Sequence, residues 1–324
     1  MEWFSKRVQT KREAISMKVG IIGSGVVGSA TGKGLAEKGF EVIFQDVNDS
    51  LLAKLEQQGY KVHNISNGYL TKEIDLSIIA VRTPTKPLDL SGEVDLSDIE
   101  IVTKAIATEL RTKKGYHTVC YRSTMPPGTT ENILVPLFEK WSGKKIHEHF
   151  GVAMNPEFLR AYNNVNDFKN PRVTVLGVSD EKTANTMLSL YGGFPGEKQV
   201  VSLTEAEMIK YANNLFNATK ISFFNEIWMI AKHLGVDPEV VSGVVSISAE
   251  ACWNPEYGTH GGVPYGGTCL PKDSFGLLNA MKKLDIELPL LRATIEVNER
   301  IKEIGNKAEG EDFDNRKHSS YDNY

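Results

Sequence analysis

Short apolar runs alternate with helix-compatible segments along the first half of the chain. The strand-like runs lie at residues 18–22, 41–45, 76–81, 118–121 and 173–176, and the main helical segments at 29–38, 99–110 and 130–141. Strands that alternate with helices form mainly parallel sheets covered on both faces. The pattern therefore predicts an α/β fold, a doubly wound parallel sheet, over residues 17–203.

After residue 203 the apolar positions recur at intervals of three and four, which indicates one long helix. Thr204 and Glu207 have capping-box spacing ahead of it, and Gly235 ends it after about 30 residues, or roughly 45 Å. Its apolar face comprises Met208, Tyr211, Ala212, Leu215, Ile221, Phe224, Trp228 and Ala231. A buried core helix would explain this face, but we favour a helix at a homodimer interface.

Further helices are predicted at about 238–247, 273–284 and 289–304, so residues 204–304 are interpreted as an all-α dimerisation domain. Residues 1–16 are interpreted as an N-terminal extension, and the polar residues 305–324 as a disordered tail. Two folded domains are in keeping with a length of 324 residues.

Composition narrows the class of protein. The net charge of −4 and the pI of about 6.0 do not favour a nucleic-acid-binding face. The sequence has no run of about 18 apolar residues, and no apolar segment follows the N-terminal basic residues, so neither a membrane span nor a secretory signal is predicted. Cys120, Cys252 and Cys269 lack metal-ligand spacing, and we expect a reduced, cytoplasmic compartment and no metal.

A glycine-rich turn joins the first predicted strand to the first helix. It consists of Gly23, Ser24, Gly25, Val26, Val27 and Gly28. Glycines in this context let backbone N–H groups approach a pyrophosphate. Asp46 ends the second strand, where a carboxylate binds a ribose 2′-hydroxyl and repels a 2′-phosphate. A dinucleotide site for NAD is therefore predicted, ahead of a turn with no ligand.

Two more loops leave predicted strands and carry hydroxyl groups. One contains Val81, Thr83, Pro84 and Thr85, and the other contains Ser123 and Thr124. Ligands of open α/β sheets bind beyond the carboxyl ends of strands, so these loops are candidates for the cofactor's ribose. On their own they are more typical of ordinary turns than of a functional site.

A second glycine-rich stretch, from Gly258 to Gly267, precedes Cys269, Lys272 and Asp273. A lysine and a helix N-terminus near a thiol lower its pKa and favour a nucleophilic thiolate. A structural cysteine is the equally weighted alternative. Cys120 and Cys252 are interpreted as packing residues.

Polar residues on the long helix and in one loop add to these candidates. Lys210 and Asn214 share one helix face and could stabilise an oxyanion, or simply bridge to another domain. Glu157, in the sequence NPEFLR, is either a general acid/base or a solvated loop residue. The histidines show no triad or ligand spacing, with His260 the one candidate among them.

Taken together, these motifs resemble those of the UDP-glucose/GDP-mannose dehydrogenase family. The matching pieces are, in order, GSGVVG, Asp46, TPT, RSTMPPGTT, NPEFLR, EAEMIKYANN with SFFNE, YGGTCLPKD and IEVNER. The likeness extends over about residues 17–304. It implies a Rossmann domain that binds NAD, a helical dimerisation domain, and a third domain that would begin about where this chain ends.

The resemblance implies a four-electron oxidation of a nucleotide sugar. The C6 primary alcohol becomes a carboxylate, as in the conversion of UDP-glucose to UDP-glucuronate for polysaccharide biosynthesis, and a UDP-sugar is favoured. Cys269 would form a thiohemiacetal and then a thioester, which water hydrolyses with Asp273 and Lys210. Lys210 and Asn214 would stabilise oxyanions, while Thr124 and Glu157 would position water or transfer protons.

The same resemblance implies two sets of contacts. Those to NAD are Gly23, Ser24, Gly25, Val26, Val27, Gly28, Asp46, Val81, Thr83, Pro84, Thr85, Ser123, Thr124 and Lys272. Those to the sugar substrate are Glu157, Phe158, Leu159, Arg160, Lys210, Asn214, His260, Val263, Tyr265 and Gly266.

Three positions depart from the family pattern. Trp253 stands where the family has a substrate-binding arginine, Ala161 replaces a glutamate, and Leu51 replaces a basic residue. A noncatalytic or partner-dependent NAD-binding dimer is therefore the alternative to an enzyme. A two-electron dehydrogenase of the 6-phosphogluconate or 3-hydroxy acid type is a third reading, which Cys269 argues against because such enzymes need no nucleophilic thiol.

Overall fold

The computed structural model describes residues 17–87, 91–160 and 163–308, with side chains described up to residue 304. The predicted extension at 1–16 and most of the predicted tail at 305–324 lie outside these residues. The chain divides into two compact units, the first ending at Asn213 and the second beginning at Asn214.

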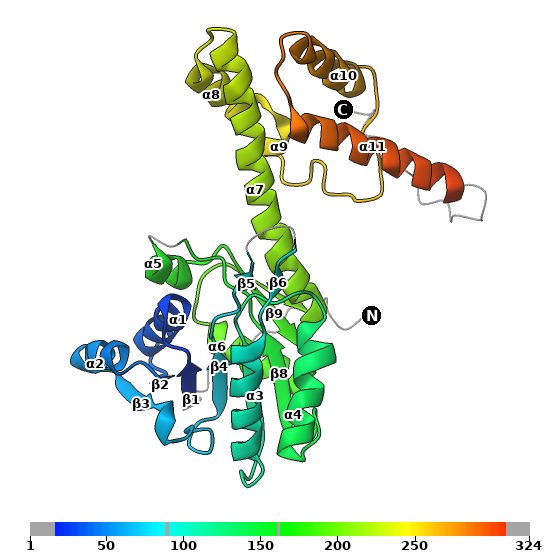
Figure 1. Ribbon diagram of the computed structural model, residues 1–324. Helices are drawn as coiled ribbons and strands as arrows, with labels where there is room; N and C mark the ends of the chain where they lie inside the picture. The colour runs from blue at the N-terminus through cyan, green and yellow to red at the C-terminus, as the bar shows by residue number, and fades with distance from the viewer. Residues whose placement is uncertain (1–16, 88–90, 161–162, 309–324) are drawn as a thin grey trace. The chain divides into compact units, whose positions relative to one another are not determined.

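An eight-stranded sheet forms the centre of the first unit (Figure 1), with the strand order β10-β9-β8-β7-β4-β1-β2-β3. The strands are β1 Lys18–Ile22, β2 Glu41–Asp46, β3 Lys61–Asn64, β4 Leu76–Ile79, β7 His117–Tyr121, β8 Phe150–Met154, β9 Val173–Val178 and β10 Glu197–Val201. All neighbours are parallel except β8 and β9, so the β9–β10 pair runs opposite to the rest. The small hairpin of β5 Thr85–Lys86 and β6 Glu93–Val94 lies apart.

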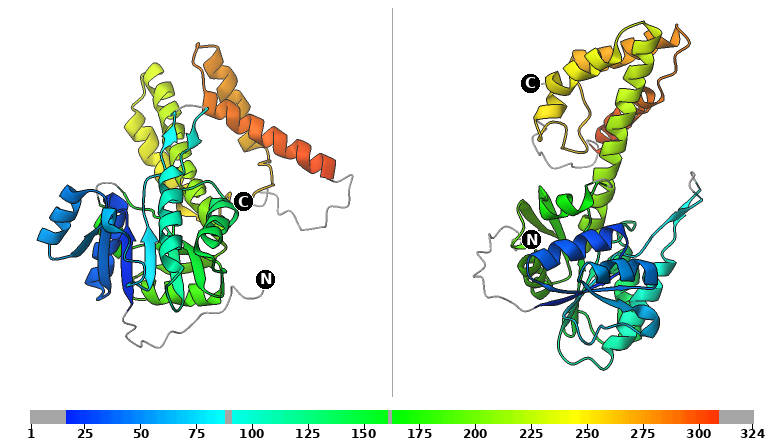
Figure 2. Two further views of the ribbon diagram at one scale, coloured as in Figure 1. Left: turned by 60° about the horizontal axis from the view of Figure 1, so that its bottom comes forward. Right: turned by 90° about the vertical axis from the view of Figure 1, so that its left-hand side faces the viewer.

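Helices cover both faces of this sheet (Figures 1 and 2). One core includes residues of α3 Ser97–Leu110 and α4 Val135–Ser142, packed on side chains such as Ile79 and Val119. The other core includes residues of α1 Val26–Glu37, α2 Asp49–Gln57, α5 Asn164–Lys169 and α6 Glu181–Tyr191, packed on side chains such as Ile21 and Phe44. The central strands, such as β4 and β7, are buried on both faces, as a sheet covered on both sides requires, and this architecture confirms the predicted α/β class.

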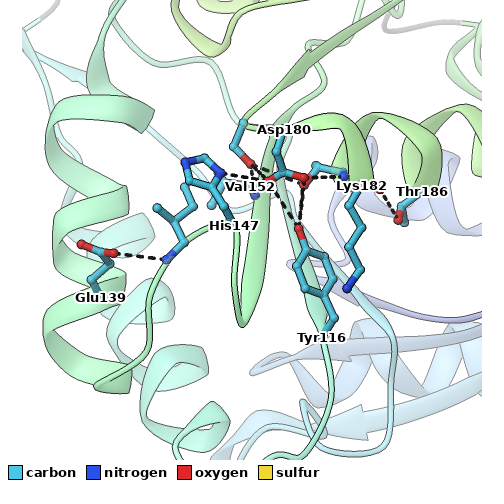
Figure 3. Close-up of polar contacts among 10 residues, drawn as sticks. Tyr116, Glu139, His147, Val152, Asp180, Lys182 and Thr186 are labelled. Atoms are coloured by element: carbon cyan, nitrogen blue, oxygen red, sulfur yellow. Dashed lines mark hydrogen bonds and ion pairs between the residues drawn. The ribbon is translucent and has the colours of Figure 1, made fainter.

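A polar network closes the edge of the sheet where β7 and β8 begin and β9 ends (Figure 3). Asp180 caps α6 by accepting from the Thr183 N–H at 2.8 Å. The same carboxylate accepts from the Ser179 hydroxyl at 2.7 Å, from the Tyr116 hydroxyl at 3.2 Å, and pairs with the His147 ring at 3.1 Å. These bonds connect the segments before β7 and β8 to the turn between β9 and α6. They lie at the edge of the sheet opposite the one that carries the candidate site.

The described residues of the second unit form helices and irregular segments and contain no strand. Helix α7, Leu203–His233, has 31 residues and carries the chain from the first unit into the second. It is followed by α8 Pro238–Ser248, α9 Glu250–Trp253, α10 Cys269–Lys282 and α11 Pro289–Ala308. A small core joins Ile230, Met281 and Leu288. Buried Glu226 accepts from the N–H groups of Leu290 at 2.5 Å and Leu291 at 3.1 Å, so α7 caps the start of α11.

Several local predictions need correction. The capping box of α7 is formed by Ser202 and Glu205, which exchange hydrogen bonds of 2.7 and 3.2 Å, and not by Thr204 and Glu207. Helix α10 begins at Cys269 rather than 273, because Thr268 already adopts helical angles. Helix α11 continues to Ala308, beyond the predicted boundary at 304. Helix α3 begins at Ser97 and α1 at Val26, earlier than predicted.

Most of the predicted apolar face of α7 is exposed on this chain. Leu215, Ile221 and Trp228 are 60%, 63% and 50% exposed, and nearby Phe216 is 65% exposed, whereas Ala231 is buried. A core helix would hide these side chains, so the single chain does not supply the cover that the pattern requires. None of the described helices is long and apolar enough to cross a membrane.

Candidate functional site

The glycine-rich turn stands at the carboxyl end of β1. Gly23 has a φ of +86° and donates its N–H to the Gln45 carbonyl at 2.9 Å. The next N–H, of Ser24, donates to Asp46 Oδ2 at 2.6 Å. The carboxylate at the end of β2 is therefore fixed against the turn, and its oxygens retain lone pairs that can accept from ribose hydroxyls.

The three glycines of this turn differ in what surrounds them. A Cβ at Gly28 would lie 2.0 Å from the Gly23 carbonyl oxygen, because strand and helix pack closely there. A Cβ at Gly25 would meet no atom within 4 Å. Gly25 is exposed at the N-terminus of α1, whose first turn contains no acidic side chain. An open backbone at a helix N-terminus suits a pyrophosphate, so the residues present fit a dinucleotide.

The loops after β4 and β7 are joined by hydroxyl groups predicted to contact the cofactor. Ser123 donates its hydroxyl to the Val81 carbonyl, and Thr83 donates to the Thr124 carbonyl, both at 2.6 Å. Pro84 and Thr85 follow, with Thr85 already in β5. These two hydroxyls are therefore occupied in holding the loops together. Thr124 itself is half-buried.

Glu157 and Lys210 form an almost buried ion pair. The Lys210 ammonium donates to Glu157 Oε1 at 2.8 Å and to its carbonyl at 2.6 Å, while Oε2 accepts from the Leu159 N–H at 2.6 Å. The ammonium also lies 5.6 Å from the centre of the Phe158 ring. Both charges are thus held by several partners, as buried ions require. The carboxylate after β8 and the lysine of α7, predicted separately, lie together.

The loop that carries Glu157 lines a cavity of about 560 Å³ in the first unit. Asn155 at its start is held by the buried Arg122 guanidinium, which donates to the Asn155 carbonyl at 3.3 Å and to its side-chain oxygen. Arg160 at its end forms a bidentate pair with Asp167. That pair lowers the pKa of the Asp167 carboxyl well below its usual range. Arg160, predicted to bind the sugar, is therefore engaged with a carboxylate.

Glu207 belongs to the site region but was predicted only as a cap. Its fully buried carboxylate accepts from the Gly128 N–H at 2.5 Å and from the Thr130 N–H and hydroxyl at 2.8 and 2.5 Å. Burial raises the pKa of Glu207, although these donors oppose the shift. It holds the loop that carries Thr124 at the start of a π-helical turn, Thr130–Leu134. Its spacing of three from Lys210 was the available signal, since both share a helix face.

The remaining candidates belong to the second unit. The Cys269 thiol is exposed at the first position of α10. Lys272 and Asp273 pair with each other at 2.6 Å, and this pair raises the pKa of the Lys272 ammonium. The predicted role of Lys272 as a cation for the thiol must therefore compete with Asp273. Asn214 lies on α7, and its side chain is exposed.

His260, Val263, Tyr265 and Gly266 lie in the irregular segment that leads to α10. Among the departures, Trp253 ends α9 with its side chain exposed, and Ala161 lies outside the described residues. No group of three or more His, Cys, Asp or Glu residues that could hold a metal occurs in the described part of the chain.

A mainly parallel sheet with a glycine-rich turn after β1 and a carboxylate at the end of β2 is the arrangement of the Rossmann class of dinucleotide-binding domains. The chain belongs to the UDP-glucose/GDP-mannose dehydrogenase family. Residues 17–195 match the NAD binding domain of this family and residues 204–300 its central domain. NAD is accordingly the cofactor.

Individual relatives carry two nucleotide-sugar specificities in their names. The chain is 35% identical to GDP-mannose 6-dehydrogenase of Azotobacter vinelandii over 87% of its own length and 68% of the relative's. It is 31% identical to a UDP-glucose 6-dehydrogenase of Haloferax volcanii over 87% and 70%. A solved ternary complex of GDP-mannose dehydrogenase from Pseudomonas aeruginosa has a TM-score of 0.82 at 33% identity, covering 91% of this chain and 72% of that one.

Proposed function

We propose that this protein oxidises the C6 primary alcohol of a nucleotide sugar to the carboxylate in two successive steps, of the UDP-glucose to UDP-glucuronate type. The observation that carries the proposal is the buried pair of Glu157 and Lys210 at the carboxyl edge of an NAD-binding sheet. Relatives that act on GDP-mannose and on UDP-glucose share this nucleotide-sugar chemistry by name. Bound NAD would accept one hydride in each oxidation.

The proposed chemistry assigns the covalent role to Cys269. After the first oxidation, the thiolate adds to the aldehyde carbon and forms a thiohemiacetal. Loss of hydride from that carbon gives a thioester, and water then releases the carboxylate and restores the thiol. A covalent bond retains the aldehyde between the two oxidations, and the exposed position of the thiol leaves it accessible to substrate.

Polar side chains supply the remaining roles in this proposal. The Lys210 ammonium and the Asn214 amide stabilise the developing alkoxide. Glu157, held in one orientation by Lys210 and the Leu159 N–H, positions water or accepts a proton together with Thr124. Asp273 with Lys210 serves the hydrolysis of the thioester. The sugar contacts proposed are those named from the family resemblance.

One assay separates the enzyme from its alternatives. The protein is incubated with NAD and either UDP-glucose or GDP-mannose, and NADH is followed by absorbance. Two NADH for each sugar, with turnover lost in Cys269→Ser and kept in the control Cys252→Ser, is the expected result. NAD binding without turnover on either sugar would instead support the noncatalytic dimer. One NADH for each small hydroxy acid, unchanged in Cys269→Ser, would support a two-electron dehydrogenase.

We also propose that the protein forms a homodimer through α7. The proposal is supported by the exposed apolar side chains of this helix, which include Phe216 and Trp228. The sequence favours a UDP-sugar as substrate, and a cytoplasmic location remains a prediction from the sequence.

A further inference from the structure

The segment before Cys269 has little structure of its own. Residues 260–267 contain Gly261, Gly262, Gly266 and Gly267 and form neither helix nor strand. Gly262 and Gly267 have positive φ angles of 85° and 70°. Such a segment samples many conformations when nothing fixes it, because glycine has the largest backbone freedom to lose.

One side chain fixes this segment at its centre. The Tyr265 N–H donates to Asn298 Oδ1 at 2.8 Å, and Asn298 Nδ2 donates to the Tyr265 carbonyl at 3.1 Å. The amide thus pairs with both main-chain groups of one residue, as a neighbouring strand would. These are the two hydrogen bonds described for residues 260–267 in the structure.

Asn298 is itself placed by the helical unit. It is 5% exposed and lies on α11, which packs against α10. Glu226 of α7 caps the first turn of α11. A buried amide that lost Tyr265 would leave its donor and acceptor unsatisfied, which is energetically unfavourable. The energetic preference therefore favours one position of the Tyr265 backbone.

We propose that Asn298 is a positioning residue that fixes Tyr265, and through the short connection Gly266–Thr268 also the approach to Cys269. The inference rests on the proposed function, since it assigns the Tyr265 segment to the sugar. It predicts that Asn298 contributes to recognition of the sugar nucleotide and not to that of NAD. Asn298 touches no reacting atom in this proposal.

Two variants and one control test the proposal. Asn298→Ala removes both hydrogen bonds, whereas Asn298→Asp retains the acceptor for the Tyr265 N–H and loses only the donor. Asn279→Ala is the control, because this exposed asparagine on α10 bonds only to the Phe275 carbonyl of its own helix. Amide exchange at Tyr265, KM for the sugar nucleotide, KM for NAD and the thermal midpoint are measured for each.

We expect the Tyr265 amide to exchange at least about tenfold faster in Asn298→Ala, equivalent to about 1.4 kcal/mol, and to an intermediate degree in Asn298→Asp. KM for the sugar nucleotide should also rise more in Asn298→Ala than in Asn298→Asp, while KM for NAD stays at the wild-type value in both. All measured values of Asn279→Ala should equal those of wild type. Unchanged exchange in both variants, or equal rises in the two KM values, would overturn the proposal. If wild type turns over no sugar, the proposed function fails, and exchange at Tyr265 still tests the positioning.

Discussion

Four buried polar side chains after residue 203 each hold a neighbouring segment of the backbone. Glu207 binds the loop after β7, Lys210 the loop after β8, Glu226 the start of α11, and Asn298 the main chain of Tyr265. All four belong to the few buried polar residues of this region. Burial of a polar group is unfavourable unless the group is hydrogen-bonded, so these four residues fix the position of the backbone segments that they bind.

At the residue scale, Gly25 and Gly28 make a matched test of the cofactor turn. Gly28→Ala forces a methyl group against the Gly23 carbonyl and should lower the free energy of unfolding by about 1–3 kcal/mol. Gly25→Ala meets open space and should leave stability unchanged, but it should weaken NAD binding about tenfold because it blocks close approach of the pyrophosphate.

Urea unfolding and fluorescence titration with NAD measure the two effects. Gly243→Ala is the control, because a Cβ there also meets no atom within 4 Å, but Gly243 lies on α8, outside the turn. A Gly25→Ala variant that binds NAD with wild-type affinity would contradict the assignment of this turn.

Some features of the candidate site could be predicted from the sequence, and others could not. Glycine spacing and the position of Asp46 located the turn between β1 and α1 and the carboxylate beside it, because that motif is local in the chain, and the binding of NAD by these residues stays a prediction. The pairs of Glu157 with Lys210 and of Glu207 with Thr130 join residues far apart in sequence, so only the fold reveals them. Lys272 was predicted to act on the thiol, but its neighbour Asp273 is the partner that the structure gives it.

At the scale of elements, most of the apolar strands were predicted, but the buried strand β8 and the two mixed edge strands were not. Strands β1, β4 and β7 are buried on both faces and stand out from their neighbours. β3 and β10 lie at the two edges of the sheet and are only partly buried, so their sequences KVHN and EKQVV carry no clear signal. The reversed direction of the β9–β10 pair follows from long-range pairing and has no local signature.

The Asp180 network gives a prediction for one element, α6. Burial alone would raise the pKa of Asp180, but hydrogen bonds from Thr183, Ser179 and His147 outweigh it and lower that pKa. A lowered carboxyl pKa contributes stability above the unfolded value of 3.8, and that stability is lost as pH falls through the folded value. Asp180→Ala should lower the free energy of unfolding by about 1–2 kcal/mol at pH 7.

Chemical unfolding at pH 7 and at pH 3 checks this prediction. The difference between wild type and Asp180→Ala should shrink at pH 3, because pH 3 lies below the unfolded pKa of 3.8 and the unfolded state then binds a proton that the folded carboxylate resists. Glu181→Ala is the control, since Glu181 is an exposed carboxylate in the first turn of the same helix, α6. Equal losses in both variants would contradict a specific role for the network.

At the scale of the whole molecule, the exposed apolar side chains of α7 predict self-association. Phe216→Glu or Phe224→Glu should convert a dimer into monomers, because each places a charge among apolar side chains. Analytical ultracentrifugation measures the mass in solution. Ile101→Glu is the control, because Ile101 is equally exposed at 61% but lies on α3. A Phe216→Glu protein that is still dimeric would count against the α7 interface.

Helix α7 has two kinds of side chain: buried ones that bind neighbouring backbone and exposed ones that have few contacts within the chain. Its charged inward residues Glu207, Lys210 and Glu226 hold neighbouring backbone, whereas outward residues such as Leu215 and Trp228 touch little within the chain. Natural or engineered substitutions at these outward positions can therefore alter assembly without disturbing the loops that the inward residues hold. Substitutions of Glu207, Lys210 or Glu226 are not tolerated in the same way, because even a conservative exchange leaves a buried backbone amide or charge without its partner.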